Sequence, residues 1–336
     1  MRVQTKRIIV ELTHRCQAAC SFCFLKASGR LNRNEREAAP AIWRKLVDSA
    51  PPGCDIYITG GEPLLRKDCL SLAERAKSRG LSCGINTLGL LADRATVERL
   101  NAAGLDYIIF SLHGPEDIHD AICGLKGAFR RAITNLRRFA LMNARRTEIL
   151  VSCTVCMENQ SSLHGLYRLA AAAGADRVLF EHLQFFTPGE AAQETAPFCP
   201  AKAIAVKTER PEIDADTIGK QLALCAKAAR TGGPALCVRP GLSRTAMDKW
   251  YRHTPSARPD CPPYRGTLVF SPDGKARFCQ NYDIFAGDGS RSSVSAIADG
   301  IRRAETLSAL QSLEKTPAAC IRCCQRHGFS VTRGSR

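Results

Sequence analysis

The sequence has few aromatic residues and no long apolar run. Phe, Trp and Tyr make up 6% of the 336 residues and do not alternate with a basic tract, so a platform for stacking nucleic-acid bases is not indicated. No stretch approaches the roughly 18 apolar residues that a membrane span needs. The opening residues, MRVQTKRIIVEL, have no apolar core and cleavage site of a signal peptide. We therefore expect a cytoplasmic protein without a membrane or nucleic-acid partner.

Acidic residues are scarce relative to basic ones. The chain has 32 Asp and Glu against 48 Lys and Arg, which gives a formal net charge of +16. An excess of this size favours acidic partners. A solvated basic surface is the alternative, because the arginines are spread along the chain. The length allows a large buried core in one domain with an appendage, or in two domains.

Cysteine, by contrast, is abundant, with 17 in the chain. In a reducing cytoplasm, metal or redox chemistry is favoured over disulfides. Three cysteines are gathered in LTHRCQAACSFCFL, at Cys16, Cys20 and Cys23. A zinc site needs four ligands, and His14 is the only neighbouring candidate for the fourth. A 4Fe–4S cluster suits three cysteines, because its fourth iron can stay open.

Strand-like and helix-like segments alternate over the first 190 residues. Six apolar, β-branched runs predict strands at 7–13, 54–60, 81–87, 105–112, 148–155 and 176–185. Periodic segments between them predict helices at 39–50, 66–79, 94–103, 126–144 and 161–173, several of them closed by glycine. Such alternation predicts parallel β/α units, which place their chemistry at the C-terminal ends of the strands.

Polar and glycine residues follow these predicted strands. The cysteine triplet comes after the first strand and Gly60-Gly61-Glu62-Pro63 after the second. Asn86 and Ser111 follow the third and fourth. Other polar residues near strand ends are candidates for facing a substrate, although none forms a motif, and the catalytic residues stay unassigned: His113, Glu158, Asn159, Glu181 and His182.

The cysteine triplet, Phe22 before its third member and GGEP some 40 residues later resemble the radical S-adenosylmethionine (SAM) superfamily over roughly residues 5 to 190. The resemblance implies an α/β fold, a partial (β/α)6 TIM-type barrel. It implies a 4Fe–4S cluster on the triplet, whose open iron is chelated by SAM. It also implies that the cofactor is contacted by Phe22, Gly60, Gly61, Glu62, Pro63, Asn86 and Ser111. A tight strand-to-helix turn opened by Pro63 is the alternative explanation of GGEP.

The resemblance implies an enzyme that cleaves SAM reductively to a 5′-deoxyadenosyl radical, which then takes hydrogen from a substrate. A reductase with flavodoxin, or a ferredoxin, would be the electron donor. Only six residues precede the first strand, whereas peptide-modifying members often carry an N-terminal recognition module. We therefore favour a small acidic metabolite that undergoes oxidation, elimination or rearrangement, with a ribosomally synthesised peptide as the alternative. An iron–sulfur electron carrier or a zinc-stapled nucleic-acid binder would not need GGEP.

The C-terminal third has its own cysteines. We expect a radical SAM core at 1–190, a connecting and partly helical segment at 191–255 with a helix over 214–230, and a small auxiliary domain at 256–336. CPPYRGTLVFSPDGKARFC (261–279) predicts a hairpin with PDG as its turn, and CIRCC follows at 320–324. This arrangement resembles the auxiliary-cluster domains called SPASM and twitch, with twitch the better match. The resemblance implies a second 4Fe–4S cluster on Cys261, Cys279, Cys320 and Cys323.

Two points stay open in this region. Cys324 is the alternative to Cys323 as a ligand, and a zinc ribbon is the alternative to a cluster, because a hairpin followed by CxxC also suits zinc. The nine remaining cysteines are assigned to the core, since free cysteine buries readily as a small apolar residue.

Overall fold

The computed structural model describes residues 5–192, 204–205, 211–254, 266–282, 284–300, 317–324 and 330–333. All six predicted strands are present, within two or three residues of their expected bounds. They are β1 (Arg7–Thr13), β2 (Asp55–Gly60), β3 (Ser82–Thr87), β4 (Tyr107–Ser111), β5 (Glu148–Val155) and β6 (Arg177–His182). Apolar side chains along them are almost fully buried, as expected for parallel strands covered on both faces.

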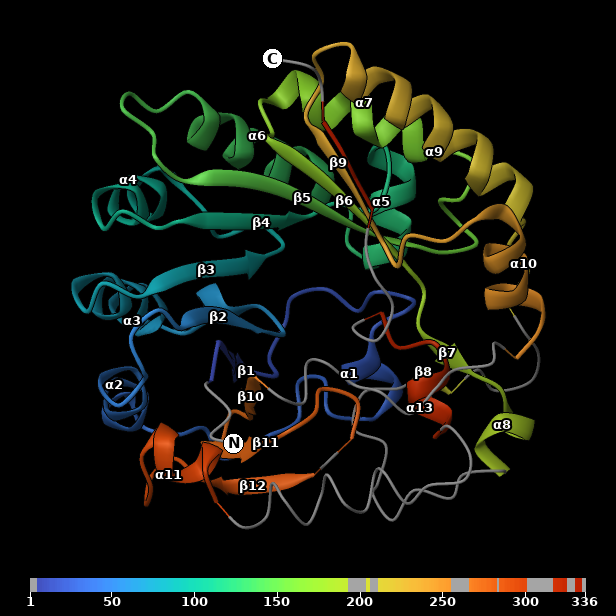
Figure 1. Cartoon of the computed structure of the whole chain (residues 1–336). Coiled ribbons are helices and arrows are strands. Elements are labelled where there is room, and N and C mark those ends of the chain that lie inside the picture. The colour runs from blue at the N-terminus through green and yellow to red at the C-terminus, as the bar shows by residue number, and fades with distance from the viewer. Residues whose placement is uncertain are drawn as a thin grey trace.

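Helices connect these strands. The five predicted helices are confirmed as α2 (Pro40–Asp48), α3 (Cys69–Ser78), α4 (Arg94–Ala102), α6 (Ala128–Ala140) and α7 (Leu163–Ala173). Gly174 ends α7 with a φ of 91°, a left-handed conformation that favours glycine. The sequence did not predict α1 (Phe24–Ala27), the short 3-10 helix η1 (Pro63–Leu65) or α5 (Glu116–Cys123). Figure 1 shows α2, α3 and α4 along one side of the curved sheet.

The strands form one sheet of eleven, in the order β12-β11-β10-β1-β2-β3-β4-β5-β6-β9-β13. β1 to β6 are parallel neighbours, as predicted. β9 (Ala235–Arg239), which the sequence did not predict, is parallel to β6 and extends this series. Within the described residues the end strands β12 and β13 do not pair with each other, so the barrel is open.

The C-terminal third completes both sides of this sheet. The predicted hairpin is confirmed as β10 (Thr267–Phe270) and β11 (Lys275–Arg277), and β10 lies parallel to β1. β12 (Phe285–Asp288) extends the hairpin, and β13 (Ser330–Thr332) pairs with β9 at the opposite edge. The predicted helix over 214–230 is α9 (Ala215–Arg230). The other elements are β7 (Phe185–Phe186), α8 (Pro188–Ala192), β8 (Ile204–Ala205), α10 (Arg244–Arg252), α11 (Val294–Ala298) and α13 (Ala318–Ile321).

The positions of α1 and α13 bring the two cysteine regions to the same end of the molecule. Figure 1 shows both helices at the end of the sheet to which the arrows of the parallel strands point. This is the end at which β/α folds place their functional groups. Among the described helices, none has both the length and the apolar composition needed to cross a membrane.

Candidate functional site

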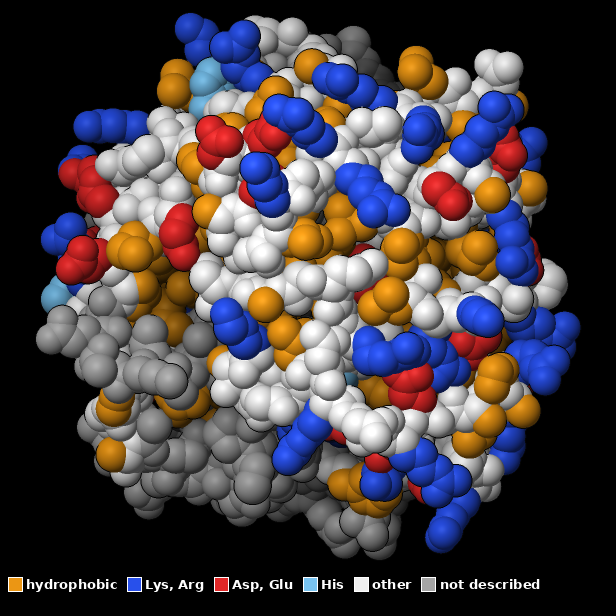
Figure 2. Space-filling view, turned by 180° about the vertical axis from the view of Figure 1, so that it is seen from behind, with side chains coloured by type: hydrophobic (Ala, Val, Ile, Leu, Met, Phe, Trp, Pro, Cys, Tyr) orange, Lys and Arg blue, Asp and Glu red, His pale blue; other side chains and the backbone are white. Residues whose placement is uncertain are grey.

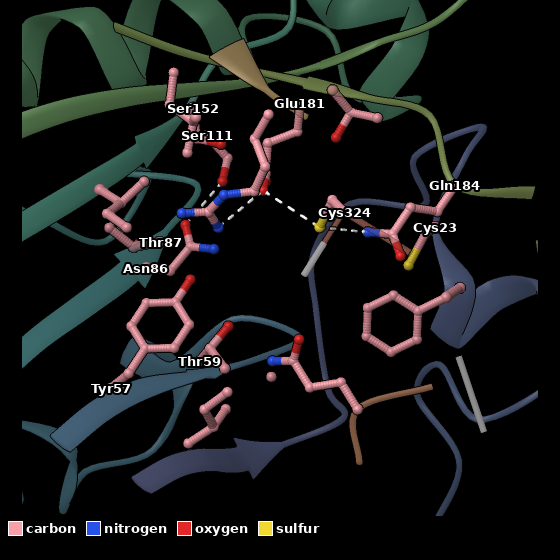
Figure 3. Close-up of a pocket in the computed structure, with 18 of the residues that line it drawn as sticks. Cys23, Tyr57, Thr59, Asn86, Thr87, Ser111, Ser152, Glu181, Gln184 and Cys324 are labelled. Carbon is pink, nitrogen blue, oxygen red and sulfur yellow. Dashed lines mark hydrogen bonds and ion pairs between the residues drawn. The ribbon is translucent and has the colours of Figure 1, made fainter. Parts of the chain in front are cut away.

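A cavity of about 710 Å³ runs through the inside of the barrel. Its lining begins with the first residues of the strands, such as Arg7 and Asp55, and reaches the loops beyond their C-terminal ends. Figure 3 shows Cys23, Gln184 and Cys324 on one side of this cavity, opposite Asn86. The cavity is lined by cysteines from both regions: Cys16, Cys20, Cys23, Cys279, Cys323 and Cys324.

The N-terminal triplet lies in the loop between β1 and α1. Asn32 holds this loop, because its Oδ1 accepts from the Cys16 N–H at 2.8 Å and its Nδ2 donates to the Cys16 carbonyl at 3.0 Å. All three cysteines are free thiols of intermediate exposure, and Cys20 and Cys23 both interact electrostatically with Cys16. Three free thiols that line one cavity fit a cluster with one open iron.

His14, the candidate fourth ligand of a zinc site, is engaged elsewhere. Its Nδ1 lies 2.9 Å from Glu35 Oε2, and its side chain is buried and is not part of the cavity lining. The geometry therefore does not bring His14 together with the three cysteines around the cavity.

Gly60 and Gly61 line the cavity on one side and contact the cysteine loop on the other. A Cβ on Gly60 would lie 2.3 Å from the Thr13 carbonyl oxygen, and a Cβ on Gly61 would lie 2.3 Å from the Arg15 carbonyl oxygen. Gly60 also has a φ of 133°. Two glycines therefore let the end of β2 run against the backbone of the loop that carries the triplet.

Glu62 does not line the cavity. Its buried carboxylate accepts from the N–H groups of Leu64 at 3.0 Å and Leu88 at 2.8 Å, and from Thr87 Oγ1 at 2.8 and 2.9 Å. Burial raises the pKa of this carboxyl to about 7, although these hydrogen bonds oppose the shift. Pro63 is also buried and opens the 3-10 helix η1. The side chain of Glu62 thus links the ends of β2 and β3.

Phe22, Asn86 and Ser111 all line the cavity. Ser111 Oγ donates to Asn86 Oδ1 at 3.0 Å, which fixes the amide at the end of β3. The Phe22 ring meets the His113 ring edge to face, with centroids 4.8 Å apart. The structure thus gathers five of the seven residues expected to contact the cofactor, and leaves the side chains of Glu62 and Pro63 outside the lining.

The other candidates near strand ends divide into two groups. His113, Glu181 and His182 line the cavity, whereas Asn159 is fully buried and donates to the His113 carbonyl at 2.8 Å. Glu158 accepts from Ser21 Oγ at 2.8 Å. Sequence reasoning did not identify many other polar residues that line the cavity, among them Tyr57, Gln184 and Arg239. Arg239 ends β9, and no sequence pattern pointed to it because β9 itself was not predicted.

Acidic and basic side chains balance in the cavity. The described lining contains three arginines and three carboxylates, which form one ion pair each. The nitrogen–oxygen distances are 3.1 Å for Arg7–Asp55, 2.6 Å for Arg177–Glu148 and 3.4 Å for Arg239–Glu181. In Figure 2, Lys and Arg are instead spread over the visible outer face with Asp and Glu between them. The basic excess is therefore not concentrated in the lining.

The C-terminal cysteines meet the barrel at its open end. Cys279 follows β11, Cys320 lies in α13, and Cys261 lies outside the described residues. Asn281 Nδ2 donates to the Ala319 carbonyl at 3.1 Å, which joins the hairpin to α13. Of the three described members of the predicted set, Cys279 and Cys323 line the cavity and Cys320 does not.

Cys324 contacts residues at the C-terminal end of β6 and just after it. Gln184 Nε2 donates to its Sγ at 3.0 Å, and Glu181 Oε1 lies 4.0 Å from the same atom. Desolvation raises the pKa of the buried Cys324 thiol well above its usual value. Cys324 therefore has neighbours that do not belong to the predicted auxiliary set.

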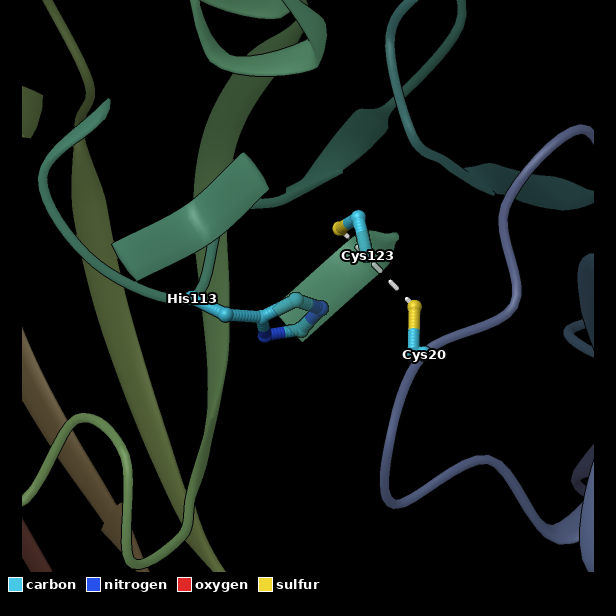
Figure 4. Close-up of side chains that lie close together, drawn as sticks. All are labelled: Cys20, His113 and Cys123. Atoms are coloured by element: carbon cyan, nitrogen blue, oxygen red, sulfur yellow. Dashed lines mark hydrogen bonds between the residues drawn. The ribbon is translucent and has the colours of Figure 1, made fainter. Parts of the chain in front are cut away.

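The triplet also contacts Cys123, which the sequence did not predict. Sγ of Cys20 lies 3.8 Å from Sγ of Cys123 at the end of α5, and the His113 ring lies within 4.8 Å of both sulfurs (Figure 4). Hydrogen bonding from Cys123 lowers the pKa of Cys20 to about 5, and His113 contributes in the same direction. Burial lowers the pKa of His119, which contacts Cys123, to about 3. Cys123 is part of the core, as expected, but it also touches a predicted ligand.

An open parallel β/α barrel, with three free cysteines after its first strand and a glycine pair after its second, has the architecture of a radical SAM domain. Residues 10–170 match the family model described as the radical SAM superfamily. The matched segment contains the cysteine triplet and the glycine pair, so this part of the chain is similar to that superfamily.

Individual relatives agree with this similarity. The chain is 28% identical over 226 residues to the PqqA peptide cyclase of Xanthomonas campestris pv. campestris strain B100, covering 65% of this chain and 57% of the relative. The chain thus spans little more than half the length of this relative.

Solved structures share the fold. Streptococcus suis SuiB bound to S-adenosylmethionine superposes with a TM-score of 0.67 at 14% identity, over 96% of this chain and 72% of SuiB. SuiB bound to the precursor peptide SuiA gives 0.66 at 13% identity, over 96% and 70%. These likenesses confirm the predicted partial barrel.

Proposed function

We propose that this chain is a radical SAM enzyme that modifies a peptide. The observation that carries the proposal is one cavity that is lined both by Cys16, Cys20 and Cys23 and by Gly60 and Gly61, inside a barrel similar to those of this superfamily. The sequence-based preference for a small acidic metabolite is less well supported than its alternative. A relative is named a PqqA peptide cyclase, and SuiB has been solved with a precursor peptide, so we assign a peptide substrate to this chain.

In this proposal, different residues of the barrel bind the cluster and contact SAM. Cys16, Cys20 and Cys23 hold a 4Fe–4S cluster, and Phe22, Gly60, Gly61, Asn86 and Ser111 contact SAM from the cavity wall. The bound cluster supplies the electron for reductive cleavage of SAM to methionine and a 5′-deoxyadenosyl radical. Glu62 and Pro63 support this wall without contacting the cofactor through their side chains, because both are buried behind it. Enclosure in the barrel keeps competing reactions away from the radical.

A second cluster occupies the C-terminal cysteines. Cys279 and Cys323 line the same cavity as the triplet, and Cys320 lies in the adjoining helix, which supports a site shared with Cys261. We favour Cys323 over Cys324 as the ligand because Gln184 engages the Cys324 sulfur. Full ligation by cysteine would leave no iron open for SAM, so this cluster would carry electrons or stabilise the fold.

The surroundings of the enzyme follow from its chemistry. Cysteine-ligated clusters and 17 cysteines, with no disulfide among the described ones, suit the cytoplasm. A flavodoxin with its reductase, or a ferredoxin, supplies the electron. An acidic substrate is supported by the net charge of +16 alone, since the charges in the described cavity lining cancel. We retain the division of the chain at about residues 190 and 255.

The triplet is tested by replacing Cys16, Cys20 and Cys23 together with alanine. After anaerobic reconstitution with iron, sulfide and a chemical reductant, the wild type should form 5′-deoxyadenosine from SAM, and the variant should lose at least about 100-fold in rate, because no ligands remain for the cluster. Cys225→Ala, a buried cysteine on α9, is the matched control and should keep the wild-type rate. A triple variant as active as this control would disprove the site.

The substrate is tested by hydrogen transfer. Candidate precursor peptides and small carboxylic acids, each deuterated, are incubated with the reconstituted enzyme and SAM. A peptide substrate should give deuterium in 5′-deoxyadenosine and a peptide product of altered mass. Deuterium transfer from small acids alone would reject the peptide assignment and restore the small-metabolite alternative.

A further inference from the structure

The end of α5 forms a buried contact with the middle cysteine of the triplet. Four groups take part, and we call them the Cys20 relay: the backbone N–H of His113, the His119 ring, the Cys123 thiol and the Cys20 sulfur. His119 and Cys123 are fully buried. The proposed function gives neither His119 nor Cys123 a role, although both lie directly behind a cluster ligand.

The backbone fixes this contact. The Ala19 N–H donates to the Cys123 carbonyl and the Ser21 N–H donates to the Ile122 carbonyl, both at 3.0 Å. These two bonds flank Cys20 in sequence and attach the triplet loop to the last turn of α5. The main chain therefore holds the backbone of Cys20 close to that of Cys123, which keeps the two sulfurs within reach of each other.

The direction of the hydrogen bonds follows from the His119 tautomer. The His113 N–H donates to His119 Nδ1 at 3.0 Å, so Nδ1 carries no proton and the neutral ring carries its proton on Nε2. His119 Nε2 lies 3.5 Å from Cys123 Sγ, which accepts this hydrogen bond. The Cys123 S–H then remains as a donor.

The Cys20 sulfur, the last of the four groups, can only accept a hydrogen bond. A cysteine that ligates iron does so as a thiolate, which has no hydrogen to donate. Across the 3.8 Å between the two sulfurs, Cys123 is therefore the donor and Cys20 the acceptor. The relay runs in one direction, from the His113 N–H through His119 and Cys123 to Cys20, and each bond in such a chain polarises the next.

The His113 side chain approaches Cys20 independently of the relay. Its Nδ1 accepts from the Thr154 N–H at 3.4 Å, which leaves the proton of the neutral ring on Nε2. A ring nitrogen of His113 lies within 4.8 Å of the sulfurs of Cys20 and Cys123. Figure 4 shows these three side chains next to one another. The Cys20 sulfur thus has two polar neighbours, the Cys123 thiol and the His113 ring.

We propose that Cys123 and His119 are positioning residues that direct a hydrogen bond onto Cys20 and thereby raise the reduction potential of the cluster held by the triplet. This inference rests on the proposed function, since it needs a cluster at Cys16, Cys20 and Cys23. Reduction adds negative charge to the cluster and its thiolates. A hydrogen bond to a ligand sulfur stabilises that charge, which is why such bonds tune cluster potentials.

The test is a redox titration of the reconstituted protein, followed by electron paramagnetic resonance of the reduced cluster at the triplet. At the midpoint of the wild type, Cys123→Ala should lower the ratio of reduced to oxidised cluster by about three- to tenfold, where tenfold corresponds to about 59 mV for one electron. Cys123→Ser keeps a donor at this position and should stay within about twofold of the wild type. Cys225→Ala is the matched control for loss of a buried thiol.

His119→Asn provides a second route to the same answer. Asn retains an acceptor near Nδ1 for the His113 N–H and removes the donor that faces Cys123. His119→Asn should lower the ratio of reduced to oxidised cluster by about two- to threefold. If Cys123→Ala does not hold a cluster, the midpoint of His119→Asn alone tests the inference. Midpoints of Cys123→Ala or His119→Asn that match Cys225→Ala would overturn the inference. A wild type without any cluster at the triplet would instead reject the proposed function.

Discussion

At the scale of single residues, Glu62 shows how the GGEP motif supports the site. Both of its carboxyl oxygens face backbone N–H groups, from Leu64 and Leu88, and Thr87 Oγ1 lies between them. A protonated carboxyl has one hydrogen, which Thr87 can accept, whereas an amide has two. In Glu62→Gln the second hydrogen would face a backbone N–H.

We therefore expect Glu62→Gln to lower the free energy of unfolding by about 1–3 kcal/mol, the cost of an unsatisfied buried donor. Urea unfolding of the cluster-free protein measures this, with Glu98→Gln on exposed α4 as a control that should change it by less than about 0.5 kcal/mol. Equal stability of the two variants would mean that the Glu62 contacts do not support the fold.

The same residue predicts a pH effect. The carboxyl pKa is about 7 in the fold and about 4.3 in the unfolded chain, so folding favours the protonated form. Its contribution to stability is complete below about pH 4.3 and is lost as the pH rises through 7. The stability difference between wild type and Glu62→Gln should therefore shrink between pH 5 and 8. A constant difference would contradict the raised pKa.

The glycines show what sequence could and could not reveal at this scale. The motif drew attention to Gly60 and Gly61, and both line the cavity. The sequence-based explanation was that glycines let the backbone approach the cofactor closely. It did not include their contact with the cysteine loop, because a sequence does not show which atoms a Cβ would meet. The backbone of residues 12–15 occupies that space. The contact between Cys20 and Cys123 was beyond sequence reasoning for a similar cause, since 103 residues separate them.

At the scale of elements, Arg322 joins four segments around the C-terminal cysteines. It follows α13, between Cys320 and Cys323, and its side chain is almost fully buried. Nη1 and Nη2 form a two-point ion pair with Glu190 of α8 at 2.7 and 3.0 Å. Further bonds reach the carbonyl groups of β7, α10 and the residue after α10: Phe185, Trp250 and His253.

We expect Arg322→Ala to lower the free energy of unfolding by about 3–5 kcal/mol, because it leaves the Glu190 carboxylate buried without its partner. Arg322→Lys should recover part of this loss, since lysine keeps the positive charge but cannot form the two-point contact of the guanidinium group. Arg244→Ala is the matched control: Arg244 makes a similar two-point pair with Asp216, but on the surface, and its loss should cost less than about 1 kcal/mol. Chemical denaturation would compare the three, and equal losses for Arg322→Ala and Arg244→Ala would contradict this role.

The elements that the sequence predicted share one property. The six strands are continuous apolar runs, and the five helices have a clear apolar periodicity, so local pattern was sufficient. β9 has five residues, as β4 has, but it directly follows two glycines and a proline, and α5 has only eight residues. Such short elements are stabilised by pairing with β6 or by contact with the triplet loop, and a local pattern does not contain those long-range contacts.

At the scale of the whole molecule, cysteines separated by about 300 residues in sequence line one cavity. The two proposed clusters would therefore both border the cavity in which we place the substrate. The six-fold barrel and the two cysteine groups could be predicted separately. Their meeting could not, because it depends on β10 pairing with β1 across the chain.

Two clusters in this arrangement should give close to eight iron and eight sulfide ions per chain after anaerobic purification. Replacement of both Cys320 and Cys323 by alanine should reduce each to about four, and should preserve SAM cleavage without substrate while abolishing product formation. Cys225→Ala should retain eight. About four irons and one zinc in the wild type would support the zinc alternative and reject the second cluster.

The two edges of the sheet also have a consequence for biosynthesis. β10, which covers β1, and β13, which covers β9, both come after the parallel strands in sequence, within residues 267–332. While the ribosome is still translating, β1 and β9 have no partner on their outer sides, and exposed strand edges favour association with other chains. We expect the nascent barrel to depend on a chaperone until residues 267–332 have emerged from the ribosome.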